Sequence, residues 1–198
     1  MEEKIRIGLL GGSFDPIHNG HLKLANWVKN KLSLNRIIFI PAAVPPHKQN
    51  VKLTDSKHRY RMVEIAIENY PDFEISDVEL KRNGISYTID TIFYFKQIFK
   101  LDKENLFLII GADSLMDFHN WKDPEKIIEN CQIVVLQRPE VNLKNAETKY
   151  KRQAIILQSP LIDISATDIR RRIKEGESIA KIVPTAVEQY ISEHNLYN

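Results

Sequence analysis

Short apolar runs alternate along the chain with segments of helical periodicity, and this alternation restricts the fold strongly. We expect strands over residues 5–10, 36–41, 73–77, 106–111, 133–137 and 154–157, and helices over residues 21–32, 55–69, 89–99, 124–130, 167–175 and 185–194. Strands that alternate with helices are typical of a parallel sheet, because each helix carries the chain back to the same edge. The pattern therefore predicts a doubly wound, mostly parallel α/β sheet. We expect one domain over residues 1–198, with a small helical part at about 165–198.

Composition and charge exclude several classes of protein. The 198 residues are 43% hydrophobic and 27% charged, which is ordinary for a soluble globular protein with one core. A net charge of +2 gives no reason to expect a nucleic-acid partner, and no apolar run approaches the length of a membrane span. The single cysteine suits a reducing compartment, and the first residues lead into a strand without an apolar leader. We expect a cytoplasmic protein, either monomeric or a homo-oligomer.

The segment from Gly11 to Leu22, directly after the first predicted strand, combines several features that suit an anion. Two glycines allow backbone N–H groups to approach a ligand closely. The following helix start presents unpaired N–H donors and the positive end of its dipole. His18 and His21 add side-chain donors that can carry positive charge near neutral pH. The segment therefore predicts a phosphate site.

Other interpretations of the same segment remain open. It lacks the G-x-G-x-x-G spacing of a dinucleotide-binding turn, and the chain contains no P-loop string. His18 and His21 also fit a zinc pair or two incidental surface histidines, although the lone Cys131 offers no thiol nearby.

A second segment with suitable chemistry lies at residues 165–170. Ser165 stands where a helix should begin, with Asp168 three residues later in a spacing close to a capping box. Thr167 offers another hydroxyl, and Arg170 lies about one turn further on the same face. Hydroxyls, free N–H groups and a guanidinium together suit a polyphosphate, while the alternative is an ordinary capped surface helix.

These two segments resemble the signatures of a known superfamily. The string G-x-F-D-P-x-H-x-G-H over residues 12–21 resembles that of nucleotidyltransferases that attack the α-phosphate of a nucleoside triphosphate. Residues 164–170 resemble the I-S-x-T-x-I-R element of the same superfamily. Ala166 stands where many relatives carry a serine, but the hydroxyls of Ser165 and Thr167 remain.

Three internal strings resemble one family more closely, the bacterial nicotinate-nucleotide adenylyltransferases. They are S-Y-T-x-D-T over residues 86–91, G-x-D-x-L followed by a tryptophan over residues 111–121, and P-P-H-K over residues 45–48. The resemblance spans about residues 7–197. It implies a Rossmann-like nucleotidyltransferase fold and transfer of AMP from ATP to nicotinate mononucleotide. The products would be nicotinate adenine dinucleotide (deamido-NAD) and pyrophosphate.

The resemblance also implies roles for residues on the ATP side. His18 would hold the α-phosphate, His21 the neighbouring phosphates or the ribose, and Arg170 the departing pyrophosphate. The rest of the implied ATP site is Gly12, Ser13, Phe14, Gly111, Asp113, Ser165 and Thr167. Mg²⁺ would be held mainly by the ATP phosphates and water, with no ligand from protein side chains. An alternative for Asp113 is a cap on the next short helix.

On the mononucleotide side, the implied residues are Lys48, Tyr87, Thr88 and Trp121. Trp121 would stack on the pyridine ring, and the helix start at Tyr87 and Thr88 would receive the nicotinate carboxylate. Lys48 would meet the mononucleotide phosphate from a proline-containing loop, residues 42–54, which we expect over the carboxyl ends of the strands. The alternatives are a core or interface tryptophan, a plain helix cap and a solvated lysine.

Other functions remain as alternatives. They are an adenylyl- or cytidylyltransferase acting on phosphopantetheine or glycerol phosphate, an enzyme for the nicotinamide form of the mononucleotide, and a non-catalytic nucleotide sensor. The presence of both histidines and Arg170 favours an enzyme over a sensor. We expect no role beyond a connecting loop for the polar residues 140–151.

Overall fold

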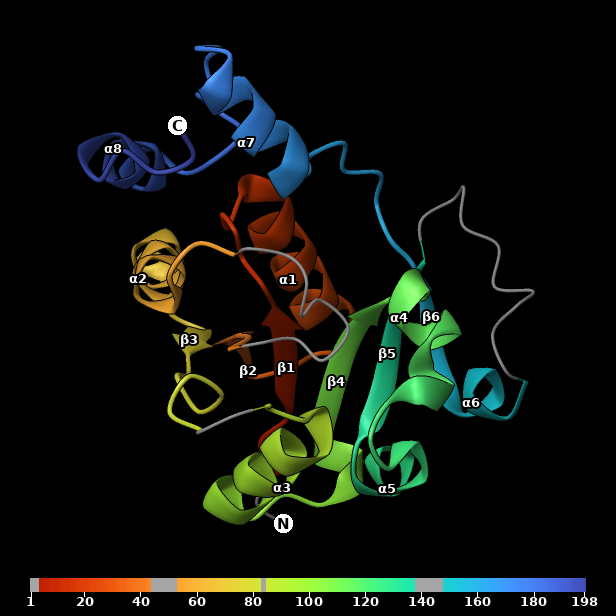
Figure 1. Ribbon diagram of the computed structural model, residues 1–198. Coiled ribbons are helices and arrows are strands. Elements are labelled where there is room, and N and C mark those ends of the chain that lie inside the picture. The colour runs from red at the N-terminus through yellow and green to blue at the C-terminus, as the bar shows by residue number, and fades with distance from the viewer. Residues whose placement is uncertain (1–3, 44–52, 83–84, 138–147) are drawn as a thin grey trace.

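A single six-stranded sheet forms the centre of the protein in a computed structural model that describes residues 4–43, 53–82, 85–137 and 148–198 (Figure 1). The strands are β1 (Ile7–Gly12), β2 (Arg36–Pro41), β3 (Phe73–Ile75), β4 (Leu106–Gly111), β5 (Gln132–Gln137) and β6 (Ala154–Gln158). Their order is β3-β2-β1-β4-β5-β6, and every neighbouring pair is parallel. The predicted doubly wound α/β fold is therefore confirmed.

Helices cover both faces of the sheet. On one face lie α1 (Asn19–Lys31), α2 (Ser56–Ile67), α7 (Ala166–Lys174) and α8 (Thr185–Glu193). On the other lie α3 (Thr88–Phe99), α5 (Pro124–Asn130) and α6 (Thr148–Gln153). None of the helices in the described ranges has the length and apolar character that spanning a bilayer requires.

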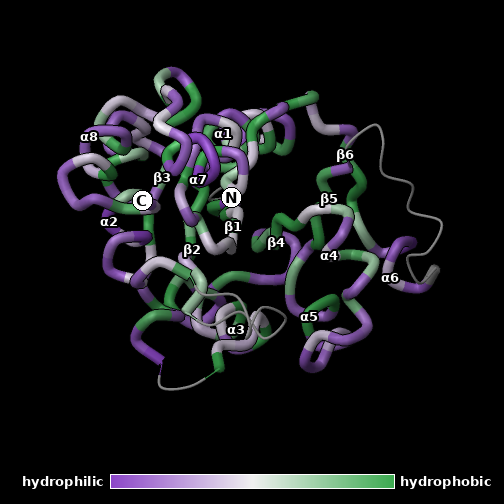
Figure 2. Tube along the Cα trace, turned by 45° about the horizontal axis from the view of Figure 1, so that its top comes forward, coloured by the Kyte–Doolittle hydropathy of each residue, from purple (hydrophilic) through white to green (hydrophobic). Residues whose placement is uncertain are grey.

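Burial on both faces explains the continuous apolar runs of the strands. In β4, Leu108 and Ile110 belong to the core cluster that packs against α3 and α5. Phe107 and Ile109 belong to the cluster that packs against α1 and α2. Because successive side chains of a strand point to opposite faces, a strand covered on both sides must be apolar throughout. Figure 2 shows β5 in the hydrophobic colour, whereas the outer helix α6 is largely hydrophilic.

Strand β1 lies between β2 and β4. Strands β2 and β3 follow on one side of β1, and β4, β5 and β6 follow on the other, so the strand order reverses direction at β1. In open parallel sheets, this reversal opens a crevice beyond the carboxyl ends of the central strands. Gly11 and Gly12 continue the pairing of β1 with Ile40 and Pro41, so β1 runs two residues beyond the predicted end. Both glycines therefore lie at the crevice.

Several short helices were not among the predicted elements. They are the 3₁₀ turns Lys103–Asn105 and Phe118–Asn120, and α6. The short helix α4 (Ala112–Met116) follows β4, where the alternative interpretation of Asp113 placed a short helix. Residues 148–151 of the segment predicted as a loop belong to α6, where Tyr150 packs its ring against that of Phe118 with centroids 5.1 Å apart. Tyr150 is 2% exposed and belongs to the core, so this part of the segment contributes to packing.

The C-terminal helices lie beside the start of α1, as Figure 1 shows for segments from opposite ends of the chain. The backbone N–H of Asn19 donates to the carbonyl oxygen of Ile182 at 2.9 Å, and its side-chain amide donates to that of Lys181 at 2.8 Å. The expectation that the N–H groups at this helix start are unpaired is therefore wrong for Asn19. The reason is that the segment between α7 and α8 packs against it.

Candidate active site

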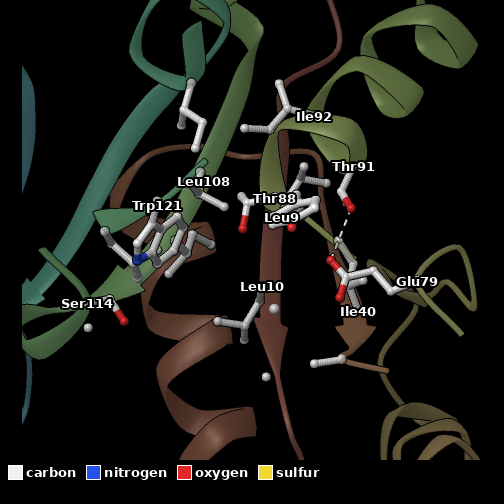
Figure 3. Close-up of a pocket in the computed structure, with 18 of the residues that line it drawn as sticks. Leu9, Leu10, Ile40, Glu79, Thr88, Thr91, Ile92, Leu108, Ser114 and Trp121 are labelled. Atoms are coloured by element: carbon white, nitrogen blue, oxygen red, sulfur yellow. Dashed lines mark hydrogen bonds between the residues drawn. The ribbon is translucent and has the colours of Figure 1, made fainter. Parts of the chain in front are cut away.

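A cavity of about 390 Å³ lies at the crevice between β1 and β4 (Figure 3). The carboxyl ends of these two strands, the start of α3 and the segment after α4 form its walls. Residues predicted as site residues that line it are Gly12, Ser13, Tyr87, Thr88, Gly111 and Trp121. The remaining lining is largely aliphatic, which suits the face of a flat ring.

The glycines at the two strand ends leave room for a ligand. A Cβ atom added to Gly11 or to Gly111 would meet nothing within 4 Å, and both residues line the cavity. At Gly12, by contrast, a Cβ atom would come within 3.0 Å of the Phe14 ring. Gly11 and Gly111 therefore keep cavity space open, and Gly12 allows the loop to pack on itself.

Trp121 and Thr88 enter the cavity from different elements, as Figure 3 shows. Trp121 also packs on Phe118 with ring centroids 5.1 Å apart. Its side chain therefore both contacts the core and lines the cavity, so the two interpretations of this tryptophan each hold in part. Tyr87 is the N-cap residue of α3, and its carbonyl accepts the N–H groups of Asp90 and Thr91 at 3.1 and 3.3 Å. The start of α3 thus faces the cavity with Thr88 as its first residue.

Lys122 was not predicted as a site residue, but it lines the same cavity. Its Nζ lies 4.3 Å from the centroid of the Tyr87 ring and 4.0 Å from the carboxylate of Asp90. An ammonium group therefore lies at the wall where a nicotinate carboxylate was expected. The available sequence signal was its position directly after Trp121.

Glu79 also lines the cavity and was missed. Its carboxylate accepts a hydrogen bond from the Thr91 hydroxyl at 3.0 Å (Figure 3). Arg82 donates to the hydroxyls of Thr91 and Ser86 at 2.7 and 2.8 Å. Burial raises the pKa of Glu79. This network ties the segment after β3 to the first turn of α3, a tertiary contact that no periodicity reveals.

His18 and His21 lie together at the start of α1. Their rings stack with centroids 3.7 Å apart, and the backbone N–H of His18 donates to Nδ1 of His21 at 3.3 Å. Because Nδ1 of His21 accepts this bond, the proton of its neutral ring lies on Nε2. Burial and the adjacent His18 lower the pKa of His21 to about 3. The expectation that both histidines carry charge near neutral pH is therefore wrong for His21 in the free protein.

Gly20 makes room for the His18 ring. A Cβ atom at this position would lie 2.9 Å from Nδ1 of His18 and 3.0 Å from Cγ2 of Ile162. His18 itself is 6% exposed, so its ring has little freedom to move away. The glycine between the two histidines is thus required by the packing of the first one.

The two distant motifs meet at Asp15. Arg170 donates from Nη1 to the Asp15 carbonyl oxygen at 2.7 Å and from Nη2 to the Thr167 hydroxyl at 3.3 Å. Asp15 and Arg170 are 155 positions apart, so the fold brings the second motif against the loop that carries His18. Arg170 thus reaches back along the face of α7 to Thr167, on which the sequence placed both residues.

The start of α7 differs in detail from the prediction. Ser165 is its N-cap residue, and its hydroxyl accepts the backbone N–H of Asp168 at 3.1 Å. The Asp168 carboxylate, predicted to complete a capping box, instead accepts hydrogen bonds from Arg171 and Arg172. Ser165 and Thr167 are exposed, so their hydroxyls are accessible to a ligand.

Three other predicted positions have different outcomes. Phe14 is 2% exposed with its ring edge-on to His21, so only its backbone can line an ATP site. Asp113 lies exposed within α4 and outside the cavity wall, and the cap of that helix is Gly111. Lys48 lies outside the described residues, as does most of the proline-containing loop.

Comparisons with known proteins agree along nearly the whole chain. Residues 9–172 match the family model described as cytidylyltransferase-like. A probable nicotinate-nucleotide adenylyltransferase of Clostridium tetani is 43% identical, covering 96% of this chain and 97% of that protein. Another, of Dictyoglomus thermophilum, is 42% identical, covering 98% of this chain and 100% of that protein.

Solved structures resemble the fold. Nicotinic acid mononucleotide adenylyltransferase of Plasmodium falciparum, complexed with NaAD, matches with a TM-score of 0.78 at 20% identity. The match covers 98% of this chain and 97% of that one. The same enzyme complexed with APC matches with a TM-score of 0.77.

Proposed function

Since the chain belongs to the cytidylyltransferase-like family, and within it to the nicotinate-nucleotide adenylyltransferases, we propose that it transfers AMP from ATP to nicotinate mononucleotide. The products are nicotinate adenine dinucleotide and pyrophosphate. The observation that carries the proposal is that an apolar cavity adjoins a polar loop. Trp121 and the start of α3 wall the cavity, and Ser13, the first residue of the polar loop (residues 13–18), lines it. The polar loop carries His18 and accepts a hydrogen bond from Arg170 at Asp15.

The reaction needs no protein nucleophile. An oxygen of the mononucleotide phosphate forms a new bond to the α-phosphorus of ATP, and the bond to the bridging α–β oxygen breaks as pyrophosphate leaves. Both substrates are polyanions, so the protein must position them in line and stabilise the added negative charge. Preorganised donors do this in a site where their dipoles need not reorient.

We assign the pyridine ring to the cavity. The indole of Trp121 offers a face for stacking, and the open space beside Gly11 and Gly111 admits the ring. The ammonium group of Lys122, together with the first N–H groups of α3, would receive the nicotinate carboxylate. Charge-assisted hydrogen bonds of this kind contribute about 1.5–3 kcal/mol each, which favours the acid over the neutral amide.

We assign the phosphates to the loop and to the start of α7. His18 would hold the α-phosphate, and His21 would act as a neutral donor through Nε2 toward the neighbouring phosphates or the ribose. Arg170, Thr167 and Ser165 would hold the β- and γ-phosphates and the departing pyrophosphate. Only the backbone of Gly12, Ser13 and Phe14 would contribute beside them.

We propose that Mg²⁺ enters bound to ATP and water. Among the described residues, no group of three or more His, Cys, Asp or Glu side chains could hold a metal ion. The Asp15 carboxylate is occupied by the Tyr197 hydroxyl and the Thr54 N–H, so the donors at this site suit phosphate better than a cation. When bound, Mg²⁺ supplies positive charge at the phosphate oxygens.

We propose that the enzyme is cytoplasmic and that its partners are ATP and nicotinate mononucleotide. A net charge of +2 with ordinary composition supports a cytoplasmic enzyme of small molecules that acts without nucleic acid or membrane. Both a monomer and a homo-oligomer are compatible with this activity.

A pyrophosphate-release assay across a panel of acceptors tests the function. The purified chain with ATP and Mg²⁺ should react fastest with nicotinate mononucleotide, more slowly with nicotinamide mononucleotide, and least with phosphopantetheine or glycerol phosphate. Equal or faster turnover of the amide would overturn the preference for the acid. Binding of ATP without pyrophosphate release from any acceptor would favour a nucleotide sensor.

A further inference from the structure

Asp15 connects three separate parts of the chain beneath the polar loop. It is 3% exposed, and both of its carboxylate oxygens are occupied. Oδ1 accepts the hydroxyl of Tyr197 at 2.7 Å, and Oδ2 accepts the backbone N–H of Thr54 at 3.2 Å. Its carbonyl oxygen accepts Nη1 of Arg170 at 2.7 Å. A buried carboxylate with every partner supplied by a distant segment fixes the backbone at that point.

A buried arginine completes this attachment. Arg59, 1% exposed, donates to the carbonyl oxygen of Ser13 at 2.8 Å and to that of Thr54 at 2.9 Å. Thr54 is therefore held at its N–H by Asp15 and at its carbonyl by Arg59. The loop is tethered on both sides of Phe14, and the charges of Arg59 and Asp15 compensate each other.

Segment 165–198 contacts the loop on both sides of His18. Before it, Tyr197 and Arg170 bond to Asp15. After it, Lys181 and Ile182 accept the hydrogen bonds of Asn19. His18 thus lies between two residues that are both held by the C-terminal segment.

The hydroxyl of Tyr197 is suited to a permanent donor role. Burial and the bond to Asp15 raise the pKa of this phenol above its ordinary value, so it keeps its proton at any working pH. Its backbone has a φ of 71°, a left-handed conformation that a tyrosine rarely adopts. The side-chain contact with Asp15 therefore accompanies a backbone conformation that an unconstrained tyrosine would seldom populate.

We propose that Tyr197 is a positioning residue for catalysis, acting through Asp15. Its hydroxyl holds Asp15 in place, and Asp15 sets the separation of two phosphate-binding groups. One is His18, three residues along the chain, and the other is Arg170, hydrogen-bonded to the Asp15 carbonyl. The inference rests on the proposed function only in taking these two groups to bind the triphosphate.

A matched pair of variants tests this role. Tyr197→Phe removes the hydroxyl bonded to Asp15, while Tyr190→Phe removes a hydroxyl of the same C-terminal segment that is 2.9 Å from Nδ1 of His58 in α2. Each change keeps the ring. Misplacement of groups by fractions of an ångström slows reactions strongly, so we expect Tyr197→Phe to lower kcat about 10-fold. KM for nicotinate mononucleotide should change less than about twofold, because Trp121 and the start of α3, to which we assign the pyridine ring, lie outside the tethered loop.

The control variant and thermal unfolding separate positioning from stability. Tyr190→Phe should keep kcat within about twofold of the original value, even where its Tm falls as much as that of Tyr197→Phe. An unchanged kcat for Tyr197→Phe overturns the proposal, and so does an equal loss of kcat in both variants.

A measurement without substrate keeps this inference separate from the proposed activity. The imidazole ¹⁵N resonances of His18 and His21 in the free protein should shift in Tyr197→Phe and stay in place in Tyr190→Phe. Unchanged resonances in Tyr197→Phe would refute the positioning role. If the original chain releases no pyrophosphate, the proposed function fails, while the resonances still decide whether Tyr197 places the histidines.

Discussion

The stacked pair of His18 and His21 shows how burial changes the chemistry expected of single residues. Two histidines near neutral pH are usually regarded as partly charged, yet two charged rings 3.7 Å apart would repel and would be poorly hydrated. His21 is therefore a neutral donor in the free protein. Because its Nδ1 accepts the His18 N–H, the remaining ring proton lies on Nε2.

Replacement of His18 by alanine tests its direct role. We expect kcat to fall by about 10²–10³, as for the loss of one transition-state donor, with a modest effect on ATP binding. Single-turnover kinetics measure the chemical step. The exposed His119 supplies the control, since His119→Ala should leave kcat unchanged. An unaltered chemical step in His18→Ala would exclude the proposed role.

Lys122 gives a second prediction at this scale. We expect Lys122→Met to raise KM for nicotinate mononucleotide about 10-fold and to change KM for the amide much less, because only the acid offers a carboxylate to the ammonium group. Lys126→Met is the control, since Lys126 lies in α5 and pairs with Asp123. An equal effect on both acceptors would mean that Lys122 does not select the acid.

At the scale of the element, β1 uses its glycines for two different purposes. A Cβ atom at Gly8 would lie 2.6 Å from Cδ1 of Ile37 and 2.9 Å from Cδ1 of Leu34, inside the core between β1 and its neighbours. At Gly11 it would meet nothing within 4 Å. The strand is therefore close-packed in its middle and open at its carboxyl end, where the cavity begins.

This contrast predicts opposite behaviour for two similar substitutions. Gly8→Ala should lower the free energy of unfolding by about 1–3 kcal/mol through overpacking, with near-normal KM for the folded protein. Gly11→Ala should leave stability within about 1 kcal/mol but weaken mononucleotide binding. Urea unfolding and KM for both variants measure the difference. A destabilised Gly11→Ala with normal KM would contradict the assignment of this space to the ligand.

At the scale of the whole molecule, burial of a neutral histidine links folding to pH. The pKa of His21 is depressed to about 3 in the folded protein, whereas an unfolded histidine titrates near 6.5. Between these values the unfolded state binds more protons, so stability is full above about pH 6.5 and falls as the pH is lowered toward 3.

We expect His21→Gln to reduce this dependence. The loss of unfolding free energy between pH 7 and pH 5 should be smaller in His21→Gln than in the original chain by up to about 2 kcal/mol. Urea titrations at both pH values measure it, with His119→Gln as the exposed control. The same acid sensitivity in His21→Gln and the original chain would show that this buried ring does not control it.

The elements were most predictable where burial is strongest. Strands 36–41 and 106–111 and helix 124–130 begin and end where the sequence predicts, because their apolar residues face core on the sides that periodicity marks. Helix α6 was missed, and α4 was expected only as an unbounded short helix beside Asp113, since five or six residues are too few to show a helical period. Tyr150 makes α6 part of the core through a contact with Phe118 that its neighbours in sequence do not indicate.

Local patterns were sufficient to locate the parallel sheet, the phosphate loop and the second motif, because periodicity and turn chemistry act over a few residues. They were not sufficient for the charge of His21, the place of Lys122 in the cavity or the bond of Tyr197 to Asp15. Each of these depends on groups that are distant in sequence or on the removal of water around them. Packing alone determines such contacts, and the pKa values follow from the same burial.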